Sequence, residues 1–311
     1  MIQGDAMATT EQGTGLLTGE ALSDRDLTTF PRWRRRTIRV ARRYPVGFAG
    51  GVVLGLFALA AVFAPWITPH DPLIQDIPNK LASPSSQYLW GADNFGRDVL
   101  SRVIYGARVS LYVGFVSVGI ATFIGTPLGV ASGYLGGIVD LVIQRFVDMF
   151  LGFPGLILAM VMVVALGASL NNVALAIGVV FLPRVVRLAR SSALTVKEEP
   201  YILAAHATGA GSLRIMLRHV LPNSLAPVFV LATGYLGTAM VIEASLSYLG
   251  LGVPPPSPSW GSMIRAGASG NLEGAPWLSM YPGLVLALVV FSVSFLGDAM
   301  RDALDPRLRG R

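Results

Sequence analysis

Long apolar stretches, separated by short polar segments, set the limits on what this chain can fold into. Six stretches of roughly 20 residues, the length that lets an α-helix cross the hydrocarbon core of a bilayer, occur in the sequence. They are residues 46–66, 110–132, 146–166, 173–190, 224–246 and 277–296. With 53% hydrophobic and 14% charged residues, the composition is also that of a membrane protein. The sequence therefore predicts an all-α integral membrane protein with six transmembrane helices.

Two of these stretches contain features that disturb a simple span. In the third, Pro154 permits a kink. In the fourth, the apolar run ends at Leu182, before Pro183, and three arginines then recur every third residue to form one stripe: Arg184, Arg187 and Arg190. Ahead of the third stretch and within it, polar residues share one helical face: Asp140, Gln144 and Asp148. Mutual pairing or snorkelling to the interface suffices to explain them.

The distribution of basic residues predicts the orientation. Nineteen lie on the side that holds both chain ends and residues 197–222, against five on the other side, so the positive-inside rule places the first side in the cytoplasm. Residues 32–43 carry seven arginines, which could bind nucleic acid or act as a targeting signal. Their place directly before an apolar span favours contact with anionic lipid instead. We expect a multi-pass protein of a bacterial inner membrane, with no nucleic-acid partner.

The same topology divides the chain into segments. Residues 1–43 form a cytoplasmic N-terminal segment, first disordered and then basic, without the apolar core of a cleavable signal peptide. Residues 44–109 hold the first span and an external loop, and residues 110–303 hold the five remaining spans. Residues 304–311 form a cytoplasmic tail.

The polar segment 199–222, which we call the elbow, is the most informative interruption of the apolar pattern. Two short helical runs, 201–208 and 213–221, flank the breaker Gly209-Ala210-Gly211, where glycine lets the backbone turn sharply. Ser212 is expected to cap the second run, and Pro222 is expected to end it. Such an elbow in water could be gripped by another protein or could be a solvated loop without a partner.

Two polar features lie outside the elbow. Asp98 and Arg102, at i and i+4 in the external loop, permit an ion pair on an interfacial helix. Glu243 is the ionisable residue deepest in a predicted span, so its carboxylate must face protein or water. It either contacts the cationic end of a substrate or forms a hydrogen bond with another helix or a partner subunit, and the second reading is favoured.

Several kinds of chemistry have no support in the sequence. The chain has no cysteine, which excludes disulfides and thiolate chemistry, and its three histidines are scattered, which argues against a metal site. The phosphate-binding pattern Gly-x-x-x-x-Gly-Lys-Ser/Thr is missing. We therefore expect no catalytic, cofactor-binding or metal-binding residue here, and any ATP and Mg²⁺ must be bound by separate ATPase subunits.

Three motifs occur in a familiar order. Ala204-Ala205, Gly209 and Leu221-Pro222 resemble the coupling motif of importer-type ABC permeases, with Leu203 and His219 at positions where Glu and Ile are usual. The string LWGADNFGRDVLSR and the loop LSYLGLGVPPPSPSWG resemble the peptide and nickel branch of that family. The end of the chain, from Gly297-Asp298 to Arg309, is also similar to that branch.

This resemblance implies a type I ABC importer permease, the second permease subunit of a dipeptide or oligopeptide importer. The implied partners are a homologous permease, two cytoplasmic ATPases and an extracytoplasmic peptide-binding protein. In this family the elbow docks on the ATPase, which implies a coupling role for Ala204, Ala205, His206, Gly209, Ala210, Ser212, Arg214, Arg218, Leu221 and Pro222. The external segments imply contact with the binding protein for Trp90, Asp93, Arg97, Asp98 and Trp260.

Other readings are kept as alternatives. A nickel-importing permease shares nearly all of these motifs, and metal-dependent growth would distinguish it. A membrane-embedded enzyme would need a nucleophile–base pair or a ligand cluster inside the spans, which contain neither histidine nor lysine. A proton-driven carrier that operates alone would leave the elbow without a role.

Overall fold

The computed structural model describes residues 41–269 and 273–304. It divides the chain into residues 1–43 and a second unit, residues 44–311. The helices of this second unit are α2 (Pro45–Val62), α3 (Ala64–Ile67), η2 (Ile77–Asn79), α4 (Val99–Leu135), α5 (Gly137–Leu151), α6 (Gly155–Leu166), α7 (Leu170–Lys197), α8 (Pro200–Ala207), α9 (Ser212–Ile215), η3 (Met216–Val220), α10 (Leu221–Tyr248), α11 (Trp260–Ala268) and α12 (Trp277–Leu304).

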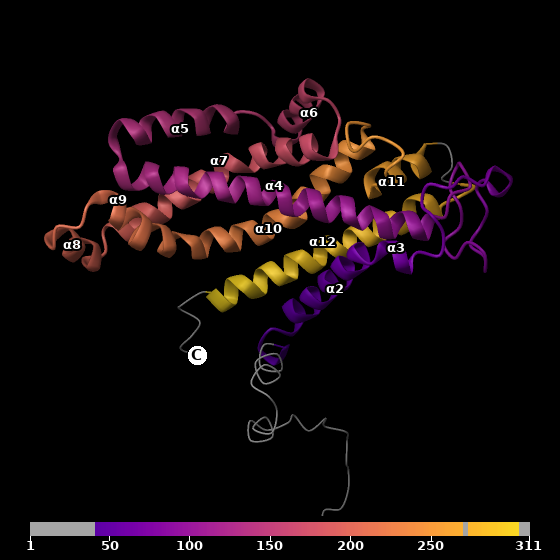
Figure 1. The fold of residues 1–311 in the computed structure, drawn as a ribbon, viewed down its shortest axis with the longest axis horizontal. Helices are drawn as coiled ribbons and strands as arrows, with labels where there is room; N and C mark the ends of the chain where they lie inside the picture. Colours follow the sequence, from indigo (N-terminus) through magenta and orange to yellow (C-terminus); the bar gives the residue numbers. More distant parts are fainter. Residues whose placement is uncertain (1–40, 270–272, 305–311) are drawn as a thin grey trace, which may run out of the picture. The chain divides into compact units, whose positions relative to one another are not determined.

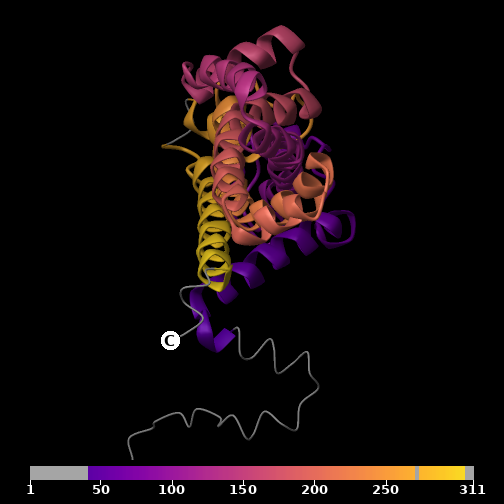
Figure 2. The same ribbon diagram turned by 90° about the vertical axis from the view of Figure 1, so that its left-hand side faces the viewer.

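Long helices run side by side through the unit. Helices α4, α7 and α10 pack against one another, and α12 packs against α10 and α2 (Figures 1 and 2). The short helices α8 and α9 lie at one end, which we call the elbow end. Helix α11 and the loop between α3 and α4 lie at the opposite end, which we call the loop end (Figure 1). Two apolar cores fill the unit, one mainly among α4, α7 and α10 and the other among α2, the first part of α4, α11 and α12.

The number of membrane-crossing helices agrees with the sequence prediction. In the described part of the chain, five helices are long and apolar enough to cross a membrane, and the bent pair α5 and α6 makes a sixth if it counts as one span. The predicted second span and the interfacial helix before it form one helix, α4, of 37 residues. At 1.5 Å per residue it is about 55 Å long, so it extends well beyond a hydrocarbon core of about 30 Å.

The predicted span 146–166 is broken more sharply than the kink that Pro154 was expected to permit. Helices α5 and α6 meet at an angle of 92° across Gly152 and Phe153. Pro154 precedes the first residue of α6 and has an extended backbone conformation. Proline disfavours a helical conformation in the residue before it and lacks an N–H group, so the helix ends there instead of bending gently. In contrast, Pro183 lies buried within α7, which continues to Lys197, beyond the predicted end.

Small residues allow α4 and α7 to approach closely. Three glycines at i, i+4 and i+8 of α4 face α7: Gly125, Gly129 and Gly133. A Cβ atom at Gly129 would lie only 2.4 Å from the carbonyl oxygen of Val186, and one at Gly133 only 2.6 Å from that of Arg190. Small residues at membrane helix interfaces let backbones pack in this way. This interface holds the elbow end of α7 in a fixed position beside α4.

Candidate functional site

The elbow forms the predicted turn, but its second helix differs from the prediction. Helix α8 ends at Ala207, and Gly209 turns the chain with a φ of 81°, a conformation that disfavours any residue with a Cβ. Gly211 occupies the N-cap position of α9, so Ser212 is the first helical residue and its predicted capping role is wrong. Pro222 does not end the helix either.

The structure shows why Pro222 is tolerated. The five residues Met216–Val220 form a π-helical turn, and α10 begins directly after it at Leu221. Pro222 thus lies just after a π-helical turn, where the regular i to i−4 hydrogen bonding is already interrupted, so its missing N–H group costs less than inside a regular α-helix. The helix consequently runs without interruption from Ser212 in the elbow to Tyr248 at the loop end. A single helical element therefore joins the elbow to the opposite end of the unit.

The elbow has a buried side and an exposed side. Ile202, Ile215 and Val220 are each at most 1% exposed and anchor the elbow in the first apolar core. Four large apolar side chains are exposed by 44% to 65%: Tyr201, Leu203, Leu213 and Leu217. Such a cluster in an otherwise polar segment is typical of a protein-binding surface.

Most residues to which the resemblance assigns coupling lie on the surface. Seven of them are exposed: Ala204, His206, Gly209, Ser212, Arg214, Arg218 and Pro222. The other three are partly buried: Ala205, Ala210 and Leu221. The predicted coupling residues did not include the four exposed apolar side chains, although Leu203 was noted as a departure from the motif and large apolar residues within a short polar segment are a signal that the sequence already contained.

Tyr134, near the C-terminal end of α4, connects the elbow to the long helices. Its hydroxyl lies 3.2 Å from Nε2 of His206 in α8, and its carbonyl oxygen accepts a hydrogen bond of 3.0 Å from Nζ of Lys197. The Lys197 ammonium also lies over the tyrosine ring, 5.8 Å from its centroid. Because Tyr134 is itself only 5% exposed, these contacts fix α8 relative to α4.

The arginine stripe of α7 pairs with the polar face of α5. Arg190 donates two hydrogen bonds to the carboxylate of Asp140, at 2.6 and 2.7 Å, and Ser132 also donates to this carboxylate. Arg187 pairs with Asp148. The carboxylates are paired, although not within their own helix as mutual pairing implied, because their partners lie on α7, up to 50 residues away in sequence. These ion pairs tie α5 to α7.

At the loop end, Asp93 organises the segment before α4. Its Oδ1 accepts hydrogen bonds from the backbone N–H groups of Phe95 and Arg97, at 2.8 and 3.0 Å. Its Oδ2 accepts one of 2.8 Å from Nε of Arg97 and lies 3.4 Å from Nε of Arg102. Asp98 instead caps α4 by accepting from the backbone N–H and hydroxyl of Ser101. Arg102 thus pairs with Asp93, in place of the Asp98 partner that the i, i+4 spacing permits.

A second carboxylate stabilises the same loop. Asp76 accepts hydrogen bonds from the Asn79 amide, at 2.7 Å, and from the Tyr88 hydroxyl, at 2.9 Å. The bond from Asn79, and then that from Tyr88, lowers the pKa of Asp76 from its ordinary value. Burial, followed by the interaction with Asp76, raises the pKa of Tyr88. The loop is therefore held by charged hydrogen bonds that form within it.

The prediction that Trp260 faces a partner protein is contradicted in this structure. Its side chain is fully buried, its Nε1–H donates to the carbonyl oxygen of Val103 at 2.9 Å, and it packs edge-on against Phe57. Asp93 and Asp98 are 7% and 2% exposed, so they too act mainly inside the unit. Three residues of the predicted set are thus interior, because the loop folds back on the helix ends.

The remaining residues of that set are only partly accessible. Trp90 packs against Tyr281 of α12 with the two rings tilted by 30° and their centroids 4.8 Å apart. The Arg97 side chain is 13% exposed. Surface groups near these residues include Leu89 and Phe95, which are 57% and 48% exposed.

Glu243 of α10 joins two helices. Its carboxylate is fully buried and accepts hydrogen bonds from Ser110 of α4, at 3.0 Å, and from Ser247, at 2.7 Å. The favoured reading, a hydrogen bond to another helix, agrees with this geometry. In the described residues no group of three or more His, Asp or Glu side chains could hold a metal ion.

Comparison with known proteins identifies the family. Residues 125–310, more than half of the chain, match the model of the binding-protein-dependent transport system inner membrane component, and residues 32–84 match the N-terminal TM domain of oligopeptide transport permease C. The chain belongs to this family of binding-protein-dependent transport permeases. It is therefore a multi-pass inner membrane protein and a permease subunit of an ABC transporter.

Curated relatives are similar over most of their length. The dipeptide transport system permease protein of Alkalihalophilus pseudofirmus is 39% identical over 96% of this chain and 99% of its own. The di/tripeptide transport system permease protein of Pseudomonas aeruginosa is 42% identical over 85% of this chain and 89% of its own. The probable D,D-dipeptide transport system permease protein of Escherichia coli is 39% identical over 86% and 89%, respectively.

A solved structure confirms the fold. A chain of the inward-facing MetNI methionine ABC transporter superimposes with a TM-score of 0.54 and 23% sequence identity, over 66% of this chain and 97% of its own. The prediction of a type I importer permease fold is therefore confirmed.

Proposed function

We propose that this permease imports dipeptides and oligopeptides in an ATP-driven complex. The observation that carries the proposal is the match, at 39% identity and nearly full length, to a permease whose name specifies dipeptide transport. We propose a homologous permease as the second half of the pathway, two ATPases that bind ATP and Mg²⁺, and a peptide-binding protein outside the cell. This chain makes or breaks no bond of the substrate.

In the proposed orientation the elbow end and both chain termini face the cytoplasm. The exposed apolar cluster, Tyr201, Leu203, Leu213 and Leu217, is the surface that an ATPase would cover. The loop end then faces the binding protein.

The proposed mechanism is alternating access driven through the elbow. Closure of the ATPases displaces α8 and α9, and the helix that begins at Ser212 transmits the displacement to Tyr248. The contacts of Tyr134 with His206 and Lys197 transmit it to α4. Rigid elements with two arrangements carry coupling of this kind. Hydrolysis then resets the helices.

Two glycine substitutions in the elbow test the coupling role. Gly209 has a φ of 81° and open space around it, so Gly209→Val strains the turn, by about 1–3 kcal/mol, without a steric clash. Gly211 also has open space but an extended backbone with a φ of −67°, which accepts valine. It is the matched control.

Each variant is co-expressed with its partner subunits and reconstituted into liposomes. We expect Gly209→Val to assemble and hydrolyse ATP but to lose most peptide uptake per ATP, whereas Gly211→Val keeps it. Normal uptake by Gly209→Val would contradict the elbow mechanism. Stimulation of ATP hydrolysis by nickel-loaded but not peptide-loaded binding protein would contradict the peptide substrate and leave the permease role intact.

A further inference from the structure

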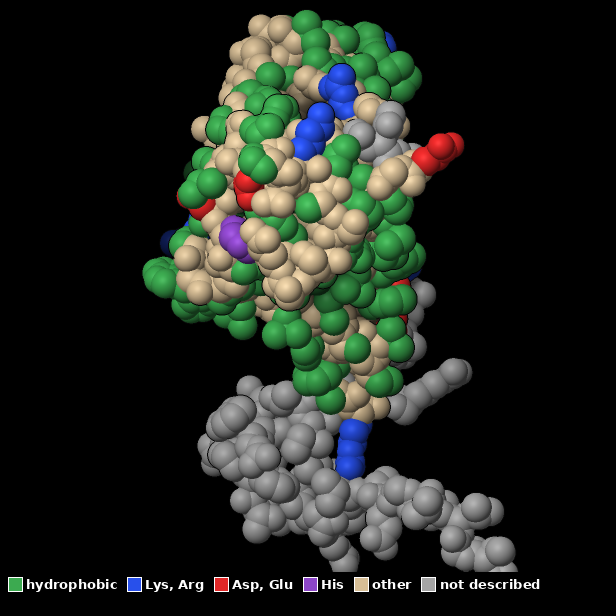
Figure 3. Space-filling view, turned by 90° about the vertical axis from the view of Figure 1, so that its right-hand side faces the viewer, with side chains coloured by type: hydrophobic (Ala, Val, Ile, Leu, Met, Phe, Trp, Pro, Cys, Tyr) green, Lys and Arg blue, Asp and Glu red, His purple; other side chains and the backbone are tan. Residues whose placement is uncertain are grey.

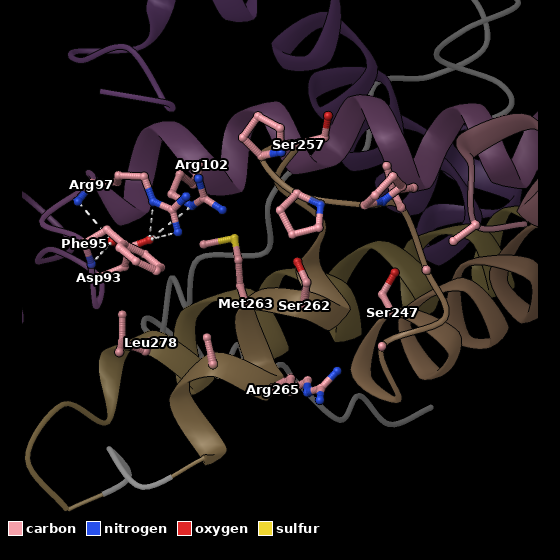
Figure 4. Close-up of a pocket in the computed structure, with 18 of the residues that line it drawn as sticks. Asp93, Phe95, Arg97, Arg102, Ser247, Ser257, Ser262, Met263, Arg265 and Leu278 are labelled. Atoms are coloured by element: carbon pink, nitrogen blue, oxygen red, sulfur yellow. Dashed lines mark hydrogen bonds and ion pairs between the residues drawn. The ribbon is translucent and has the colours of Figure 1, made fainter. Parts of the chain in front are cut away.

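A pocket of about 530 Å³ opens at the loop end. Its walls come from the loop before α4, the start of α4, the segment after α10, helix α11 and the start of α12 (Figure 4). This volume lies within the range of about 300–1,000 Å³ that is typical of sites for small ligands. The pocket is thus large enough for a short peptide.

The charged lining of the pocket is mostly basic. Three arginines line it, Arg97, Arg102 and Arg265, against one carboxylate, Asp93, among the described lining residues. Both oxygens of Asp93 already accept hydrogen bonds. Figure 4 shows Asp93, Arg97 and Arg102 gathered on one side of the pocket, with Arg265 apart from them. The net positive charge favours an anionic ligand group.

The two arginines differ in what they offer such a ligand: Arg102 contributes charge, because its Nε is buried and its Nη1 donates to the Pro72 carbonyl oxygen at 2.9 Å, whereas Arg265 retains its donors. Arg102 is 5% exposed, and its Nε has no partner of hydrogen-bonding geometry in the described residues, since Asp93 lies 3.4 Å away. The Arg265 guanidinium has no hydrogen-bond or ion-pair partner in the part of the chain that the structure describes. It lies against Gly250, where a Cβ would approach Nη1 to 2.3 Å. Gly250 therefore leaves the room that Arg265 occupies at the pocket wall.

The rest of the lining suits a small amphipathic molecule. The hydroxyl groups of Ser247, Ser257 and Ser262 supply hydrogen-bond donors and acceptors, whereas Met263 and the prolines at 254–256 supply apolar walls. At the surface of the loop end, Lys and Arg side chains lie among apolar and polar groups (Figure 3). An arginine beside apolar walls is the usual arrangement for recognising a carboxylate with a hydrophobic body.

We propose that this pocket is an entry site for short peptides, in which Arg265 binds the C-terminal carboxylate. The inference rests on the proposed function and extends it to a site on the permease itself. Arg102 supplies a second positive charge on the side of the pocket that holds Asp93 and Arg97, apart from Arg265 (Figure 4). Asp93, the one carboxylate among the described lining residues, is already engaged by Arg97 and two backbone N–H groups, so the site recognises the C-terminal end and the side chains of the peptide.

The test uses the complex of both permeases and both ATPases in lipid nanodiscs, without the binding protein. Tritiated Ala-Phe is the probe, and its binding is measured by equilibrium dialysis. We expect Arg265→Gln to weaken binding about tenfold or more, because a charge-assisted hydrogen bond is lost, and Arg265→Lys to weaken it less. The matched control, Arg301→Gln, removes an exposed arginine near the other end of α12 and should change nothing.

Competition with modified peptides tests which end is bound. Ala-Phe amide should compete about tenfold less well than Ala-Phe, and N-acetyl-Ala-Phe should compete equally well. Equal competition by the amide, unchanged affinity of Arg265→Gln, or no saturable binding to the wild type would each overturn the site. If Arg265→Gln weakened only the binding of the peptide-binding protein and not that of Ala-Phe, the arginine would serve protein docking. This result would also overturn the site.

An uptake assay with the binding protein distinguishes failure of the entry site from failure of the proposed function. If the wild-type complex in liposomes imports Ala-Phe but Arg265→Gln binds it normally, the entry site is wrong and the proposed function stands. If the wild-type complex imports no peptide, the proposed function fails, and with it the inference.

Discussion

Gly129 lies at the close approach of α4 and α7, and replacing it with alanine should push the two helices apart. The added Cβ would lie 2.4 Å from the Val186 carbonyl oxygen and 2.6 Å from Cβ of Ala189, where ordinary contact begins at 3.4 Å. Relief of the first contact requires a shift of 3.4 − 2.4, or about 1 Å. A gap of that size removes about a quarter to a half of the dispersion energy of each contact affected.

The expected cost follows from two opposing effects. Overpacking costs about 1–3 kcal/mol, whereas alanine favours the helix over glycine by up to about 1 kcal/mol. Gly119, in the same helix, is exposed and has no atom within 4 Å of the position that a Cβ would take. Gly119→Ala should therefore gain the stability that comes from the higher helix propensity of alanine, without an overpacking cost. The difference between the two variants is therefore the overpacking cost itself, about 1–3 kcal/mol.

The measurement is reversible unfolding of the purified permease in mixed micelles with increasing SDS, followed by tryptophan fluorescence. We expect Gly129→Ala to unfold at a lower SDS fraction than the wild type and Gly119→Ala at an equal or higher one. Equal unfolding free energies for the two variants would refute the reasoning, because they would show that the interface has room for a methyl group.

Two further predictions concern polar contacts between helices and use the same unfolding assay. Exchanging the charges of Asp140 and Arg190 should recover part of the stability that either single charge reversal loses. We expect a coupling energy of about 1 kcal/mol in the double-mutant cycle. A coupling energy of zero would contradict the ion pair. Glu243→Gln should change the unfolding free energy by less than about 0.5 kcal/mol, because an amide can pair with the hydroxyls of Ser110 and Ser247. Glu243→Ala should lose about 1–3 kcal/mol, and equal effects of the two variants would argue against these hydrogen bonds.

The sequence by itself determined the class of fold and the place of the elbow. An apolar stretch of about 20 residues has few stable alternatives to a membrane helix, since every backbone polar group must be satisfied within it. The turn at Gly209 was also predictable, because a positive φ is a local requirement that glycine meets. Such features depend on composition and on short-range geometry.

Local rules were insufficient where neighbouring residues compete. The helices on either side of Pro154 meet at 92°, Pro183 is accommodated inside α7, and Pro222 lies within the continuous helix that it was expected to end. The same residue type thus has three outcomes. The difference comes from the surroundings, such as the π-helical turn before Pro222, and not from the proline itself.

Only the tertiary structure decided which polar groups meet. The spacing of Asp98 and Arg102 permitted a pair, but Asp98 caps α4 and Arg102 turns to Asp93. Trp260, for which the resemblance implied contact with the binding protein, is instead buried against α4. The pocket with Arg265 gathers segments from residue 75 to residue 278. Contacts across such distances depend on helix packing, which the order of residues along one helix does not specify.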